Sequence, residues 1–329
     1  MLNIRPGIGL DIGSQKTKLI GIRQWNRHVS LVTFGSIPTP AGVIEAGYIL
    51  DPVSLGEELG KLVTRLKLKG KKVVAALTGP QVYTRSLIMP QMKLREMRES
   101  AYYQATTFLP IPIEELTIDI FPLRNFSDDE GKKTEVFFVA VRRQQVDNLS
   151  LACRIAGLKL AVVEIEPLAL FRALGRSVDI PTQAFLNIGP ARSYFAVFWH
   201  GVLVYYRSFT WECSALKDSD SNKAVPALDG KTVAGNRESL FKDLTSEVLR
   251  SWEYYHMQKE RDIGRVVLCG GGSRFPGLGN ALSVKLGRDI EIADTIAGLK
   301  LTGNIKEWEI NDLKYDYPVA LGLALRQVI

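Results

Sequence analysis

The most constraining feature of the sequence is a β-hairpin pattern that occurs twice. Residues 8–22 form an apolar stretch, a glycine turn and a second apolar stretch, and residues 184–201 repeat this pattern at a displacement of 176 positions. The positions that correspond are Leu10 and Leu186, Ile12 and Ile188, Gly13 and Gly189, Lys16 and Arg192, and Thr17 and Ser193. Internal repeats at this distance indicate two similar domains that face each other. We therefore predict an α/β fold with two related halves, residues 1–180 and 181–329.

The first half contains a stretch in which the order of expected strands and helices changes. Before it, strands are expected to about residue 37, a helix over 55–66 and a buried strand over 72–77. A second set of elements follows, which we predict to be a small inserted α/β subdomain of about residues 81–165. Its expected elements are a strand over 85–89, a helix over 94–108, strands over 116–123 and 135–141, a helix over 144–156 and a strand over 158–164.

The second half reopens with the repeated hairpin and a third strand at 202–209. A polar loop is expected over 214–235, then a long helix whose apolar residues reach Tyr255. A short buried strand at 265–269 runs directly into a glycine-rich segment.

The two glycine turns have a chemical consequence. Successive backbone N–H groups can converge on an anion only where no Cβ stands in the way. Two such turns that face each other would clamp a phosphate chain. Asp11 and Asn187, which precede the turns, can reach a hydrated Mg²⁺ on those phosphates, since Mg²⁺ keeps most of its water ligands. The alternative is an ordinary surface β-turn at each position.

Charge and cysteine content exclude several classes of protein. The chain has 42 Lys and Arg against 35 Asp and Glu, a net charge of +7, which is mild for 329 residues and does not imply nucleic acid as a partner. Three separated cysteines without a Cys-x-x-Cys pair argue against a disulfide scaffold or a zinc finger. No apolar run approaches the length of a spanning helix. We expect a cytoplasmic protein.

One dense run of positive charge interrupts this mild balance, where a helical pattern passes into a turn. The run is either a solvated face or a surface attracted to an anionic partner or the inner face of a membrane. Its members are Lys61, Arg65, Lys67, Lys69, Lys71 and Lys72.

Several motifs in order carry a family resemblance over nearly the whole chain. They are GLDIGSQKTKL from Gly9, AGYILDP at 46–52, MPQM at 89–92, YYQATTFLPIPIEEL leading into TIDIFPL, AGLKLAVVEIEPLAL, and the late GGGSRFPGL. With them the sequence resembles the actin-like ATPase superfamily, and within it the FtsA-like PilM family of type IV pilus assembly. The resemblance implies a duplicated actin-like, ribonuclease H-like fold with a small inserted subdomain.

The resemblance also implies an ATP site with Mg²⁺. Asp11, Gly13, Ser14 and Lys18 would form the first phosphate hairpin, with Lys18 on phosphate oxygens and Asp11 on the metal shell. Asn187 and Gly189 would form the second hairpin, and Asn187 would reach the metal through water. Gly270, Gly271, Gly272 and Ser273 resemble the loop that lies against the adenosine, although a plain strand-to-helix connection has the same pattern.

The second hairpin departs from the family pattern. The family usually carries Asp where this chain has Asn187, and Pro190 removes one backbone N–H. An uncharged amide orders a metal-bound water more weakly than a carboxylate. Glu238 and Lys242 are the nearest substitutes for the acid and lysine that the family places over the purine, although an ordinary i, i+4 ion pair on a helix face has the same pattern. The chain is therefore expected to be at most a weak or degenerate ATPase.

The resemblance implies a scaffold of type IV pilus biogenesis. Such a protein would bind the short cytoplasmic N-terminal tail of a PilN-like single-span inner-membrane protein, in a groove between the first subdomain and the inserted one. It would contact other pilus platform and motor components and would lie at the inner face of the membrane through its partner. Two alternatives share the fold: a polymerising division protein like FtsA, and a sugar-kinase-like phosphotransferase.

Overall fold

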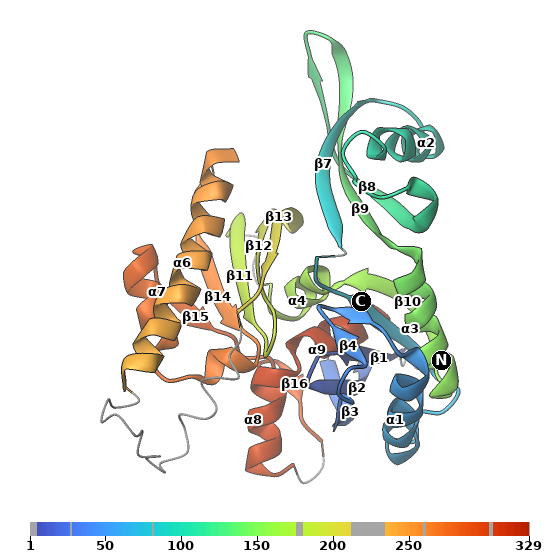
Figure 1. Cartoon of the computed structure of the whole chain (residues 1–329), viewed down its shortest axis with the longest axis vertical. Coiled ribbons are helices and arrows are strands. Elements are labelled where there is room, and N and C mark those ends of the chain that lie inside the picture. Colours follow the sequence, from blue (N-terminus) through green and yellow to red (C-terminus); the bar gives the residue numbers. More distant parts are fainter. Residues whose placement is uncertain are drawn as a thin grey trace.

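Two large β-sheets lie beside each other and a smaller sheet extends from the first (Figure 1). The computed structural model describes residues 5–26, 28–80, 82–175, 180–211, 234–258, 261–302 and 305–328. Within these ranges, no helix combines the length and the apolar character that crossing a bilayer requires.

The first sheet has six strands in the order β10-β6-β1-β2-β3-β16. The antiparallel meander β1, β2 and β3 stands at its centre, and β6 and β10 run parallel to β1. The strands are β1 (Arg5–Ile12), β2 (Lys16–Trp25), β3 (His28–Pro38), β6 (Lys72–Leu77), β10 (Lys159–Ile165) and β16 (Leu299–Lys300). The short strands β4 (Ile44–Glu45) and β5 (Tyr48–Ile49) pair with each other between β3 and α1.

The second sheet has the order β13-β12-β11-β14-β15. Its meander is antiparallel, and β14 and β15 run parallel to β11. The strands are β11 (Thr182–Ile188), β12 (Ser193–Trp199), β13 (Val202–Phe209), β14 (Arg265–Cys269) and β15 (Ile290–Ile292). This order and these directions repeat β3-β2-β1-β6-β10 of the first sheet. The predicted duplicated α/β fold is confirmed.

Helices cover the sheets on the faces that the apolar periodicity marks. In the first half, α1 (Pro52–Arg65) and α3 (Arg143–Ile155) pack against each other, and α4 (Glu166–Leu174) packs against α9 (Pro318–Leu325). Asp51 caps α1 by accepting from the backbone N–H of Val53 and Ser54, each at 3.0 Å. Added Cβ atoms at Gly7 and Gly9 would collide with the backbone of α9, so these glycines let α9 approach β1 closely.

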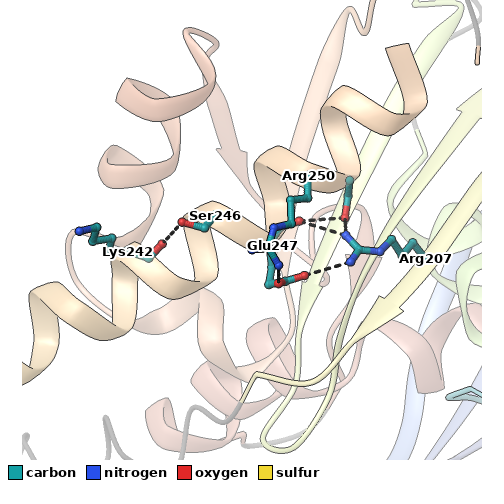
Figure 2. Close-up of polar contacts among 6 residues, drawn as sticks. Arg207, Lys242, Ser246, Glu247 and Arg250 are labelled. Atoms are coloured by element: carbon teal, nitrogen blue, oxygen red, sulfur yellow. Dashed lines mark hydrogen bonds and ion pairs between the residues drawn. The ribbon is translucent and has the colours of Figure 1, made fainter. Parts of the chain in front are cut away.

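In the second half, α6 (Ala234–Gln258) and α7 (Leu278–Leu286) share a buried cluster with the second sheet. Arg207 on β13 holds α6 in place: it donates to the Glu247 carboxylate at 3.1 Å and to the Ser251 hydroxyl at 2.8 Å (Figure 2). Lys242 is exposed on the same helix, where its carbonyl accepts from the Ser246 hydroxyl (Figure 2). The side chain of Glu238 lies outside the described residues.

The inserted subdomain has its own sheet, in the order β7-β9-β8, and its own core beneath α2. Its elements are β7 (Tyr83–Pro90), α2 (Leu94–Ala105), the 3-10 turn Ile113–Glu115, β8 (Leu116–Asp128) and β9 (Gly131–Arg142). Strand β10, at the end of the expected insert, pairs with β6 in the first sheet, and α3 packs on α1. We propose that the subdomain comprises residues 83–142.

The C-terminal segment returns to the first half. After β15, strand β16 pairs with β3, and α8 (Glu307–Asp316) leads into α9 against β1. We propose that the halves 1–180 and 181–329 divide the duplicated fold, with residues 299–328 as an arm that joins the second half to the first sheet.

Candidate functional site

A cavity of about 630 Å³ lies between the two halves, and both hairpin turns line it. The turns close in the same way: Gly13 N donates to Lys16 O and Gly189 N donates to Arg192 O, each at 3.0 Å. A Cβ on Gly13 would lie 2.9 Å from Lys16 O, and one on Gly189 would lie 2.5 Å from Arg192 O. Both turns therefore require glycine, and they face a common hollow as the repeat predicts.

Most of the predicted site residues lie on the wall of this cavity. Gly272 and Ser273 do not, because they are the buried middle residues of the short 3-10 turn Gly271–Arg274, whose two end residues do line the cavity. Ser273 is buried, and its hydroxyl donates to Gly270 O at 2.7 Å. Of the predicted glycine-rich segment, only the first two residues, Gly270 and Gly271, therefore face the cavity. The predicted residues on the wall are Asp11, Gly13, Ser14, Lys18, Asn187, Gly189, Gly270 and Gly271.

The buried Asp11 and the partly buried Lys18 form an ion pair at the first hairpin. They are register partners on β1 and β2, and Lys18 Nζ lies 2.6 Å from Asp11 Oδ2. Burial acts to lower the pKa of Lys18, but the charge of Asp11 and its hydrogen bond outweigh burial and raise that pKa. Lys18 is therefore charged at any physiological pH, and its position suits an anion in the cavity.

The second hairpin presents uncharged groups at the equivalent positions. Asn187 and Tyr194 are register partners on β11 and β12, where Asp11 and Lys18 stand in the first hairpin. Burial raises the pKa of Tyr194 well above its usual value, so the phenol stays protonated. Among the described residues, the hydroxyls of Tyr194 and Ser193 have no hydrogen-bond partner, although both residues line the cavity. Buried hydroxyls without partners at a cavity wall are suited to a polar ligand or its water.

Glu166 is a cavity residue that the sequence interpretation did not single out. It is the first residue of α4, directly after β10. Burial, reinforced by the charge of Asp11, raises the pKa of its carboxyl to about 8. The sequence feature that could have indicated this site is the Glu-Pro pair between a buried strand and an apolar helix.

Asp316 at the end of α8 is a second acid on the wall that was missed. Its carboxylate lies 2.8 Å from Arg274 and 3.6 Å from Lys16. A Cβ on Gly271 would lie 3.1 Å from Asp316 Oδ1. No local pattern marks Asp316, because the fold brings it to the cavity from the far end of the chain.

The charges on the wall suit an anionic ligand of nucleotide size. Glu166 is protonated near neutral pH, which leaves four cations against two ionised acids. The volume lies in the range of small-molecule sites, roughly 300 to 1,000 Å³. Within the described part of the chain, no three acids, histidines or cysteines cluster as a metal cage, and the few ligands present suit a cation that keeps its water. The residues therefore fit phosphates with a hydrated Mg²⁺. The wall cations are Lys16, Lys18, Arg192 and Arg274.

The two matched sheets around a shared cavity define a protein with the actin-like ATPase fold. The chain is similar to the ethanolamine utilization protein EutJ from Carboxydothermus hydrogenoformans, with a TM-score of 0.54 and 15% identity over 97% of this chain and 89% of that one. This likeness supports the fold alone.

A closer similarity lies within this class. A solved structure described as the PilM-PilN type IV pilus biogenesis complex matches with a TM-score of 0.83 and 28% identity, over 98% of each chain. Residues 9–222 and 237–328 match the family model described as type IV pilus assembly protein PilM. The chain belongs to the PilM family.

Proposed function

We propose that this chain is a cytoplasmic scaffold of type IV pilus assembly that binds the N-terminal tail of a PilN-like single-span inner-membrane protein. The observation that carries the proposal is the similarity, over 98% of both chains, to the protein solved in the PilM-PilN complex. Through this partner the scaffold lies at the inner face of the membrane, where it contacts other platform and motor components.

The inserted subdomain offers what an extended tail needs. Its sheet has two edge strands, β7 and β8, whose outward N–H and C=O groups can pair with a peptide. On β7, Leu87 and Met89 are buried on the side of α2, while Ile88 between them is 60% exposed on the other face. On β8, Phe121 is 66% exposed and pairs across with Phe137. Main-chain pairing at an edge and apolar anchors beside it support tail binding here.

A binding titration tests this proposal. The first residues of the partner, labelled with a fluorophore, are titrated with the full chain, and a scrambled tail serves as the control. The expected result is saturable binding of the native tail alone. Ile88→Asp should weaken this binding, whereas Val284→Asp, an exposed position on α7, should leave it unchanged. Equal binding of native and scrambled tails, or no binding, would overturn the scaffold assignment.

The cavity supports a second part of the proposal, the binding of Mg-ATP as a conformational ligand. Lys16, Lys18 and the hairpin N–H groups would hold the phosphates, and Gly270 and Gly271 would lie against the nucleoside. Asp11 and Asn187 would orient the waters of Mg²⁺. Because the wall belongs to both halves, bound nucleotide would favour one relative position of the halves over others.

Calorimetry with Mg-ATP tests the nucleotide site. Gly271→Val places a branched side chain on the wall beside Asp316 and should abolish the binding heat. Gly279→Val on α7, where a Cβ would meet nothing closer than 3.9 Å, should bind like the parent chain. Unchanged affinity in Gly271→Val would show that the nucleotide binds elsewhere. Nothing among the described residues favours the phosphotransferase or the polymerising division protein that the sequence left open.

A further inference from the structure

Six exposed cationic side chains lie in, or directly beside, two neighbouring loops of the first half. One loop joins α1 to β6, and the other joins α3 to β10. The run of lysines noted in the sequence supplies only the first loop, and the fold adds the second. The six residues, called the basic platform below, are Lys67, Lys69, Lys71, Lys72, Arg154 and Lys159.

Backbone hydrogen bonds hold the two loops together. Gly70 N donates to Gly157 O at 2.7 Å, and Lys159 N donates to Lys71 O at 2.9 Å. The stem of Lys69 lies over Gly157, where its Cγ would be 3.3 Å from an added Cβ. These contacts hold the backbones of the two loops in place, so the backbone does not have to be ordered when a partner binds.

The segments that carry this surface lack acidic residues. Residues 59–73 and 148–163 contain neither Asp nor Glu. Among the described residues, none of the six platform cations forms an ion pair, whereas Lys61 on the adjoining turn of α1 is paired with Glu58. The C-terminal end of a helix explains one member, Arg154 in the last turn of α3. The other five lie beyond the helix ends, so local helix electrostatics do not account for them.

We propose that the basic platform binds the anionic headgroup surface of a phospholipid membrane. Five of its six cations are lysines, compact point charges that follow a diffuse negative field and lack the bidentate fork of arginine. The same two segments contain no aromatic residue on which a base could stack, which disfavours nucleic acid. Ile155, 38% exposed beside Arg154, adds an apolar group at the level of the headgroups. The contact goes beyond the proposed function, because it needs no protein partner.

Co-sedimentation of the full chain with vesicles tests the platform. Vesicles of phosphatidylcholine mixed with phosphatidylglycerol are compared with vesicles of phosphatidylcholine alone, at low and high salt. Binding is expected only to the anionic vesicles, and salt should weaken it because the charges are exposed. Since the vesicles carry no protein, a failed tail titration would not affect this result.

Two variants with the same net charge distinguish binding through the platform from attraction of the vesicles to the positive net charge of the whole chain. Each basic residue near an anionic surface strengthens binding by about fivefold, so removing four platform charges should weaken it by at least about a hundredfold. The platform variant carries Lys69→Gln, Lys71→Gln, Lys72→Gln and Lys159→Gln. The control carries Lys132→Gln, Lys242→Gln, Lys285→Gln and Lys300→Gln, all exposed positions elsewhere.

The control variant should bind anionic vesicles nearly as tightly as the parent chain. The proposal is overturned if neither vesicle is bound, if both are bound equally, or if the two variants lose the same affinity. Tighter binding to duplex DNA than to anionic vesicles at equal salt would also overturn it. Equal unfolding midpoints of the two variants establish that the platform variant is folded.

Discussion

Replacing Glu166 by Gln should remove a pH-dependent loss of stability that the buried carboxyl imposes. Its pKa is about 8 in the folded chain, against an ordinary value of 4.5. Since the folded pKa is raised, the protonated carboxyl contributes stability that is fully present below the ordinary value and is lost as pH rises toward 8. At about 1.4 kcal/mol per pKa unit, the parent chain should lose on the order of 3 kcal/mol of unfolding free energy between pH 5 and pH 8 through this group.

Chemical denaturation at several pH values measures this effect. The Gln variant keeps a polar side chain of the same shape but cannot ionise, so its stability relative to the parent should rise steadily from pH 5 to pH 8. Glu57→Gln, an exposed position on α1, is the matched control and should show a constant difference across the same range. If the Glu166→Gln and parent curves run parallel, the carboxyl is not held in its neutral form and the description of the cavity charge is wrong.

Three further substitutions test the packing and the cavity. Gly56→Val should lower the free energy of unfolding by about 3 kcal/mol, because a Cβ there would lie 2.7 Å from Ile155 Cβ. Urea unfolding measures this free energy, and a decrease below about 1 kcal/mol would argue against close packing of α1 on α3. Arg207→Ala should lower the free energy of unfolding by about 1 to 3 kcal/mol, because it removes the hydrogen bonds from Arg207 to α6. Amide hydrogen exchange should increase in α6 before other elements, and an equal increase throughout the chain would contradict this. Lys18→Met should weaken Mg-ATP binding in calorimetry by at least about tenfold through loss of a cation, and unchanged affinity would separate Lys18 from the phosphates.

The hairpins could be predicted from the sequence because each one contains its own explanation. The glycine turn and the alternating apolar residues are local, and the same pattern occurs twice at a constant displacement. A Cβ at Gly13 or Gly189 would crowd the carbonyl that closes the turn. A glycine at this position in the sequence therefore indicates a tight turn. The prediction that both turns face one cavity followed from the duplication.

Sheet membership could not be predicted in the same way. The strand at 159–165 has the composition of any buried strand, and nothing local distinguishes pairing with β6 from pairing within the insert. Its place at the edge of the first sheet is determined by tertiary contacts, which the local sequence does not show. For this reason the sequence predicts an insert to about residue 165, whereas the strand pairing supports the proposed end at residue 142.

The missed cavity residues have a related cause. Asp316 reaches the wall only because α8 leads into α9, which returns to the first sheet. Glu166 depends on how deeply the start of α4 is buried beside Asp11. In the glycine-rich segment, Gly270 and Gly271 line the cavity, whereas the backbone path directs Gly272 against Ile188.

Binding of the chain to its intact membrane partner in nanodiscs tests the scaffold proposal most directly. The PilN-like protein is reconstituted with and without its N-terminal tail, in uncharged lipid so that the basic platform does not contribute. The proposal predicts saturable binding to nanodiscs that carry the complete partner and none to those that carry the shortened one. Equal binding to both forms would contradict it.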